Sequence, residues 1–179
     1  MTIETLATQG RTKVHTGLAG IETAKLKQIR NQNLRMCFNR LEETHFRREF
    51  VARIHGKTFI NDAASRSANA TWYTLESTEG NIIWITDTHN PAEEYQKITT
   101  ILKNKVRMII CLGKNTETVH RRLTPYVSNI IDADNMTAAV NAALYNNIEE
   151  ASVVFSPSCD NGVETETLGK AFQAEVYEL

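Results

Sequence analysis

The sequence contains few cysteines and no long apolar run. Its three cysteines, Cys37, Cys111 and Cys159, are widely separated, so they form neither a disulfide framework nor a Cys-x-x-Cys metal pair. No apolar stretch approaches the roughly 18–20 residues that span a bilayer. The N-terminus also has no apolar segment typical of a secretory signal. These absences predict a cytoplasmic protein that does not act on membranes.

Several nucleotide-binding and hydrolytic motifs are also absent. The sequence has no Gly-x-x-x-x-Gly-Lys-Ser/Thr phosphate loop and no Gly-x-Gly-x-x-Gly turn. With only 8 glycines, it offers no obvious phosphate cradle. It also lacks the His-Glu-x-x-His zinc motif and the Gly-x-Ser-x-Gly nucleophile turn. No catalytic residue and no metal ligand set is predicted from these motifs.

Charge is unevenly distributed along the chain, although the formal net charge is only −1. Residues 11–48 hold nine Lys/Arg against three Glu, a local balance of +6, whereas residues 49–179 carry −6. A basic segment of this kind can bind nucleic acid. The more ordinary interpretation is a solvated helix face, or a face that docks on an acidic protein surface, and nucleic acid is the less favoured partner.

Apolar periodicity predicts an α/β fold. Residues 1–45 are predicted to be an N-terminal arm with a helix over about 23–43, and residues 46–179 a single domain. Two short strands around His55-Gly56 indicate a hairpin. After it, short apolar strands alternate with helices, which favours a parallel sheet covered on both faces. The expected strands cover residues 50–54, 57–61, 82–85, 106–112, 129–131 and 153–155, and the expected helices cover 65–77, 91–104, 116–123, 135–146 and 164–178. We therefore predict a Rossmann-like three-layer domain with about six strands, mostly parallel, and an antiparallel edge.

Candidate caps and core residues follow from the same pattern. Ser65 or Ser67 is a plausible N-cap for the first helix of the domain, and Asn135 or Thr137 for a later one. The aromatic residues Trp72, Tyr73 and Trp84 are predicted to fill the core.

The loop Ser156-Pro-Ser-Cys159 is the first place to expect a site, because ligands bind where loops leave the carboxyl ends of parallel strands. Asn61-Asp62 lies at a second strand end, where Asp62 can hold a ligand amine or a metal, or cap a helix. Asp87 and His89 follow a third strand, as an acid–base pair or as a polar loop with Asx turns.

Two further interpretations concern single residues. Cys159 with His89 can be a nucleophile and its base, although cysteine is commonly a small buried hydrophobe. Lys114 follows a strand and Gly113, so it can place a cation near an anionic ligand.

Five short pieces of the sequence together resemble one family. They are Phe38-Asn-Arg-Leu41, Arg47-Arg-Glu49, Ile60-Asn-Asp62, Ser156-Pro-Ser-Cys159 and Gly169-x-x-Phe172. Their order and spacing over residues 34–179 resemble the C-terminal domain of the Mur ligases, most closely the D-glutamate-adding branch of peptidoglycan synthesis. The resemblance implies a Rossmann-like sheet, mostly parallel with one antiparallel edge. The resemblance does not extend to the family's N-terminal domain or to its central ATPase domain.

The sequence departs from this family where the family holds its amino acid. Ala64 and Arg66 stand at positions where the family has Lys and Thr. Thr86-Asp-Thr-His-Asn90 replaces a Gly-Gly-x-Asp-Lys-Gly turn, and the stretch after Cys159 is shortened. The ligand-binding residues that the resemblance implies are Asn61, Asp62, Arg66, Asp87, His89, Ser156, Cys159 and Asn161.

The favoured hypothesis is a stand-alone, degenerate Mur ligase C-terminal-type domain, a non-catalytic binding or regulatory module. It would dock on a cell-wall ligase or another protein through the basic helix 24–48. The alternative is the C-terminal part of an ATP-dependent D-glutamate ligase. Such a ligase forms an amide bond and would need the family's other domains to do so. A third possibility is an independent Cys-His hydrolase. The family uses ATP and Mg²⁺, whereas no cofactor is expected for this chain alone.

Overall fold

The computed structural model describes residues 45–87, 95, 98–114, 116–160 and 162–179, which belong to a unit that begins at Thr44. The predicted arm, its helix over 23–43 and most of the basic segment 24–48 lie outside the described residues. The same is true of the start of the helix predicted from Pro91.

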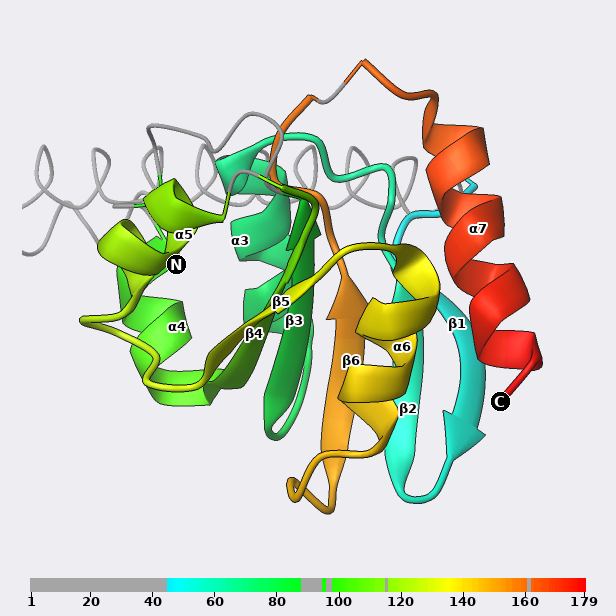
Figure 1. The fold of residues 1–179 in the computed structure, drawn as a ribbon, viewed down its shortest axis with the longest axis horizontal. Coiled ribbons are helices and arrows are strands. Elements are labelled where there is room, and N and C mark those ends of the chain that lie inside the picture. The colour runs from blue at the N-terminus through cyan, green and yellow to red at the C-terminus, as the bar shows by residue number, and fades with distance from the viewer. Residues whose placement is uncertain (1–44, 88–94, 96–97, 115, 161) are drawn as a thin grey trace, which may run out of the picture. The chain divides into compact units, whose positions relative to one another are not determined.

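Six strands form one mixed sheet in the order β1-β2-β6-β3-β4-β5. Strand β1 (Glu49–Ile54) runs antiparallel to β2 (Lys57–Asn61) at one edge, and the other neighbours are parallel. The remaining strands are β3 (Ile82–Asp87), β4 (Val106–Leu112), β5 (Ile130–Ala133) and β6 (Ala151–Phe155). Figure 1 shows β6 lying between β2 and β3. The predicted fold class is confirmed.

The hairpin between β1 and β2 turns at the two residues that the sequence indicates. His55 has φ 48° and Gly56 has φ 80°, so both occupy the left-handed region. A two-residue turn with this geometry matches the right-handed twist of the flanking strands, which is why it closes tight hairpins. The turn therefore fixes the register that pairs Ile54 with Lys57.

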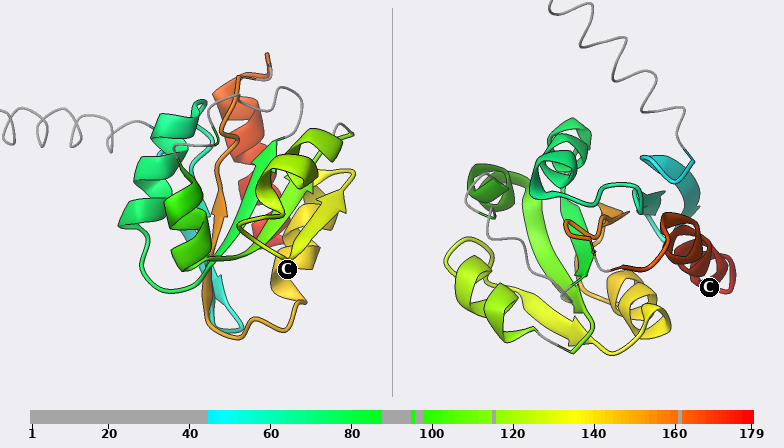
Figure 2. Two further views of the ribbon diagram at one scale, coloured as in Figure 1. Left: turned by 90° about the vertical axis from the view of Figure 1, so that its left-hand side faces the viewer. Right: turned by 90° about the horizontal axis from the view of Figure 1, so that it is seen from above.

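Helices cover both faces of the sheet. One face carries α3 (Ala68–Ser77), α4 (Thr99–Lys105) and α5 (Glu117–Leu123), and the other carries α6 (Met136–Leu144) and α7 (Thr165–Tyr177) (Figures 1 and 2). Along β3, Ile82 and Trp84 pack in the α3–α5 layer, whereas Ile83 and Ile85 pack in the α6–α7 layer. Because successive strand side chains point to opposite faces, a continuously apolar strand supplies both layers.

The first residues of α3 and α6 show which of the predicted N-caps are used. Ser67 caps α3 by accepting a hydrogen bond from the Ala70 N–H, and Asn135 caps α6 by accepting one from the Ala138 N–H. The alternative that Asp62 caps a helix is wrong, because α3 begins only at Ala68.

The aromatic core prediction is correct for Trp84, which is fully buried, and wrong for Trp72, whose exposed fraction is 42%. Trp72 lies on the outward face of α3, where the strands do not cover it. Among the described helices, none is long and apolar enough to cross a bilayer.

Candidate functional site

The loop after β6 lies at the point where the sheet topology changes direction. α3, which follows β2, and α4, which follows β3, cover one face of the sheet, whereas α7, which follows β6, covers the other. Strand β6 lies between β2 and β3. The polypeptide therefore leaves β6 toward one face of the sheet and leaves each of its two neighbouring strands toward the other face. Such switch points are where open α/β sheets bind ligands. We call the polar residues around these three strand ends the carboxyl-edge cluster, namely Asn61, Asp62, Ser65, Thr71, Thr74, Thr86, Ser156 and Ser158.

Backbone hydrogen bonds continue past the strand ends and hold the β6 loop, Ser156–Cys159, against its neighbours. The Asp62 N–H donates to the Phe155 carbonyl at 2.8 Å, and the Ser156 N–H donates to the Ile85 carbonyl at 3.0 Å. The Ser158 N–H donates to the Ser65 carbonyl at 3.1 Å. The loop is thus an extension of the sheet.

Hydroxyl groups of the β6 loop are hydrogen-bonded within the protein. The Ser156 and Thr71 hydroxyl oxygens lie 2.7 Å apart, and those of Ser158 and Thr86 lie 2.9 Å apart. The Trp84 indole N–H donates to the Ser156 carbonyl at 3.0 Å. Ser158 adopts φ 61°, which is unfavourable for a side chain with a Cβ, and these contacts hold it there.

Asn61 performs a structural role in this geometry. Its side chain is fully buried, its Nδ2 donates to the Gly169 carbonyl of α7 at 2.9 Å, and its Oδ1 accepts from the Ala63 N–H at 3.2 Å. An amide at this position therefore joins the end of β2 to α7.

Asp62 is the buried carboxylate at the end of β2. Its Oδ1 accepts from the Arg48 N–H at 3.2 Å, whereas its Oδ2 has no hydrogen-bond partner among the described residues. Burial raises the pKa of Asp62, and the positive charge of the Arg47 guanidinium opposes this shift. The Ser65 and Thr74 hydroxyl oxygens are buried and equally unpaired in the described part of the chain. Groups of this kind commonly hold an ordered water.

Arg66 faces the start of α7. Its guanidinium donates to the Val163 carbonyl at 2.6 Å and forms an ion pair with Asp160. The Gly162 N–H and the Arg66 guanidinium lower the pKa of Asp160. This cation is therefore occupied by the loop that follows β6.

Of the other predicted residues, Asp87 ends β3 and is buried, and its carbonyl accepts a long contact of 3.8 Å from the Cys159 thiol. Cys159 is 5% exposed, a placement typical of a structural cysteine. His89 and Asn161 lie outside the described residues, so the Cys159–His89 pair remains a prediction. Lys114 is exposed just after β4.

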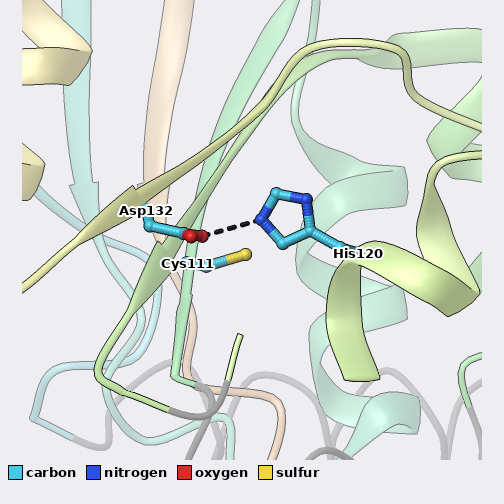
Figure 3. Close-up of side chains that lie close together, drawn as sticks. All are labelled: Cys111, His120 and Asp132. Atoms are coloured by element: carbon cyan, nitrogen blue, oxygen red, sulfur yellow. Dashed lines mark hydrogen bonds and ion pairs between the residues drawn. The ribbon is translucent and has the colours of Figure 1, made fainter. Parts of the chain in front are cut away.

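A second group of chemically active side chains was missed by the sequence interpretation. Cys111 of β4, His120 of α5 and Asp132 of β5 converge, with one ligand atom from each lying within 4.8 Å of the others (Figure 3). The spacing Cys-x8-His-x11-Asp within one strand–helix–strand unit is the only sequence signal for it. Burial, and then the Asp132 carboxylate, raise the pKa of Cys111 to about 12.

No model in a scan of protein families matches the chain. The chain is 31% identical over 179 residues to the UDP-N-acetylmuramoylalanine–D-glutamate ligase of Porphyromonas gingivalis, an alignment covering 98% of this chain and 40% of that protein. The ligase of the same name from Christiangramia forsetii is 29% identical over 177 residues, again covering 40% of the relative. The chain is homologous to these D-glutamate ligases over about two fifths of their length.

The fold is similar to that of a solved structure. A murein peptide ligase from Psychrobacter arcticus superposes with a TM-score of 0.51 and 11% identity, covering 75% of this chain and 30% of that one. The chain spans about two fifths of the length of the curated relatives that it matches.

Proposed function

We propose that this Mur ligase C-terminal-type domain is a non-catalytic binding or regulatory module related to peptidoglycan synthesis. The observation that supports this is the commitment of the carboxyl-edge side chains to the protein itself. Asn61 binds the α7 backbone, and Ser156 and Ser158 bind threonines of the same domain. A ligand would have to break these buried hydrogen bonds, and each leaves a buried polar group unpaired at a cost of about 1–3 kcal/mol.

Anion binding at this edge is weakened as well. Ala64 occupies the position where the resemblance implies a lysine, and the Arg66 guanidinium is paired with Asp160. Asp62 adds a buried carboxyl group at the end of β2. An amino-acid carboxylate or a phosphate would therefore meet an Arg66 that is already paired and the acidic side chain of Asp62.

The chemistry of the family's reaction also points away from catalysis by this polypeptide alone. Formation of an acyl phosphate from ATP depends on groups that bind and position the phosphates and magnesium. The sequence contains no phosphate loop to supply them. We infer that any ATP-dependent step takes place on another polypeptide segment.

Calorimetry and a ligation assay test the proposal. The 179-residue chain is titrated with ADP, D-glutamate and UDP-N-acetylmuramoyl-L-alanine, and is then assayed with ATP and Mg²⁺. We expect no heat of binding to D-glutamate and no product. The paired variant Ala64→Lys with Arg66→Thr restores the family's residues, and we expect it to gain D-glutamate binding. Turnover by the unmodified chain would overturn the proposal.

A second candidate function is the C-terminal part of an ATP-dependent D-glutamate ligase. One observation favours it: the alignment with the Porphyromonas gingivalis ligase extends over 98% of the chain and is not confined to the described domain. The test is to add the remaining part of that ligase in trans and to measure D-glutamate ligation. Product that forms only when both polypeptides are present, and that falls in Asp62→Asn, would establish this function in place of the first.

The basic segment 24–48 is the part that we propose docks on a cell-wall ligase. Binding of the chain to such a ligase should weaken with added salt, because its partner surface would be acidic. Binding that is insensitive to salt would argue against this surface.

A further inference from the structure

The cluster of Cys111, His120 and Asp132 lies at a point that the sheet topology creates. Cys111 and Asp132 pair in register on the adjacent parallel strands β4 and β5, so their side chains point to the same face. α5 connects these two strands and packs on that face, which brings His120 above them. Figure 3 shows the sulfur, the imidazole and the carboxylate directed into one space.

The donor atoms are those of a zinc-type site. A thiolate, an imidazole and a carboxylate together suit Zn²⁺, whereas Mg²⁺ and Ca²⁺ select oxygen ligands only. Three protein ligands with a fourth position left for water are typical of open zinc sites. The His120 and Asp132 side chains are 36% and 52% exposed, so the fourth position faces solvent.

The distances need only a small adjustment. Bond lengths of about 2.0–2.3 Å place the ligand atoms of a tetrahedral zinc roughly 3.3–3.6 Å apart. Here His120 Nε2 and Asp132 Oδ1 lie 2.7 Å apart in a hydrogen bond, and no pair of ligand atoms exceeds 4.8 Å. Metal binding would therefore require the two partly exposed side chains, His120 and Asp132, to rotate, which opens the first distance and shortens the longest.

A further hydrogen bond already orients the carboxylate. The Thr116 hydroxyl donates to Asp132 Oδ2 at 3.0 Å, so Oδ1 is left to face His120 and Cys111. Support of this kind around a ligand is a regular feature of metal sites, where it fixes the direction of the ligand atom.

We propose that Cys111, His120 and Asp132 bind a divalent zinc-type cation, with solvent or an external ligand in the fourth position. Binding breaks the His120–Asp132 hydrogen bond and forms three bonds from sulfur, Nε2 and Oδ1 to the metal. The thiol proton leaves to solvent. The proton that Nε2 donates to Asp132 in the free protein is also given up, and the neutral imidazole that binds the metal through Nε2 carries its one proton on Nδ1. The site shares no residue with the carboxyl-edge cluster, although Cys111 pairs in register with Thr86 of that cluster, and the proposal does not depend on the function proposed above.

Cobalt titration of the full chain tests this site, because Co²⁺ reports a thiolate ligand by a charge-transfer band in the near ultraviolet. The protein is reduced, treated with a chelator and titrated with Co²⁺. We expect the band to saturate at about one equivalent and to disappear when Zn²⁺ displaces the cobalt. A chain that gives no band overturns the proposal.

Substitutions identify the ligands. Cys111→Ser should abolish the band, whereas Cys159→Ser and Cys37→Ser, the matched cysteine controls, should retain it. Thr116→Val should weaken cobalt binding about tenfold, because the carboxylate loses its orienting partner. A band that survives Cys111→Ser, or that is lost in either control, overturns the assignment.

If Cys111→Ser does not fold, a substitution of the partly exposed ligand His120 still tests the proposal. His120→Gln removes an imidazole that is not part of the core, so the chain should fold as judged by circular dichroism. We expect at least about tenfold weaker cobalt binding in this variant, and Zn²⁺ should raise the Tm of the wild type but not of the variant. Unchanged cobalt affinity in folded His120→Gln overturns the site.

Discussion

Gly169 of α7 is expected to respond to substitution in the opposite sense from an ordinary helical glycine. A Cβ added there would lie 2.4 Å from Cγ and Cδ1 of Phe46 and 2.8 Å from its Cδ2. Phe46 is only 2% exposed, and its carbonyl accepts a hydrogen bond from the Ala64 N–H at 3.1 Å. The ring therefore packs directly on the helix backbone, and the base of the ring cannot move without its main chain.

The two effects of Gly169→Ala oppose each other. Replacing glycine by alanine inside a helix stabilises it by about 1 kcal/mol. Overpacking a buried contact costs about 1–3 kcal/mol, and contacts of 2.4 Å to two atoms of a ring place this case at the upper end. We expect a net loss of about 1–2 kcal/mol in the free energy of unfolding. In a Phe46→Ala background the overpacking vanishes, so the same substitution should stabilise by about 1 kcal/mol.

Urea unfolding of the four proteins of this double-mutant cycle measures the effect. Phe46→Ala alone should cost about 3–5 kcal/mol, as for other buried rings. The change of sign between the two backgrounds corresponds to a coupling of about 2–3 kcal/mol. If Gly169→Ala stabilises both backgrounds equally, Phe46 does not pack on α7 as the structure describes.

Three other predictions concern single side chains. Lys57 is 2% exposed and its Nζ donates to the Ala143 and Leu144 carbonyls at the end of α6, at 3.0 and 2.7 Å, so Lys57→Met should cost about 2–4 kcal/mol by urea unfolding. Asn135→Ala should cost about 1 kcal/mol, because it removes the cap of the same helix. Burial raises the pKa of Asp62, so the native state holds that proton more tightly than the unfolded chain. Its contribution to stability is therefore largest at low pH and is lost as pH rises through the raised pKa, and Asp62→Asn should gain stability relative to wild type over that range.

Matched substitutions serve as controls for these three. Lys170→Met removes an exposed lysine and should change the free energy of unfolding little. If it lowers stability as much as Lys57→Met does, the buried contacts of Lys57 are not the cause of the loss. Thr137→Ala, two residues beyond the cap, should leave stability nearly unchanged, in contrast to Asn135→Ala. Asp160→Asn should show the reverse pH dependence from Asp62→Asn, because the pKa of Asp160 is lowered. If the free energies of unfolding of Asp62→Asn and the wild type differ by the same amount at every pH, the pKa of Asp62 is not raised by burial as stated.

Local pattern was enough to predict most of the described elements. The strand predicted over 106–112 matches β4, and the hairpin at His55-Gly56 is confirmed. These features depend on neighbours in the sequence, namely apolar runs and a turn with glycine in the left-handed region. Prediction was less successful where the outcome depends on a distant segment. Trp72 has a core-forming side chain, yet it lies on the face of α3 that no strand covers.

The carboxyl-edge cluster shows the same division. The sequence indicated that Asn61-Asp62 and the β6 loop each follow a strand, and the structure places them there; that the two strand ends are neighbours follows from the pairing of β2 with β6. It did not indicate that Asn61 would bind the α7 backbone or that Ser156 would bind Thr71, because those partners lie 108 and 85 residues away in the sequence. Whether a polar side chain remains available to a ligand depends on such distant partners.

By itself the sequence determined the succession of strands and helices, the hairpin, and the resemblance to the Mur ligases, since each depends on residue types at short spacing. The tertiary structure decided that β6 inserts between β2 and β3, because strand order follows from long-range packing and not from local pattern. It also decided that Cys111 and Asp132 lie side by side beneath His120, because only the register of β4 against β5 brings them together.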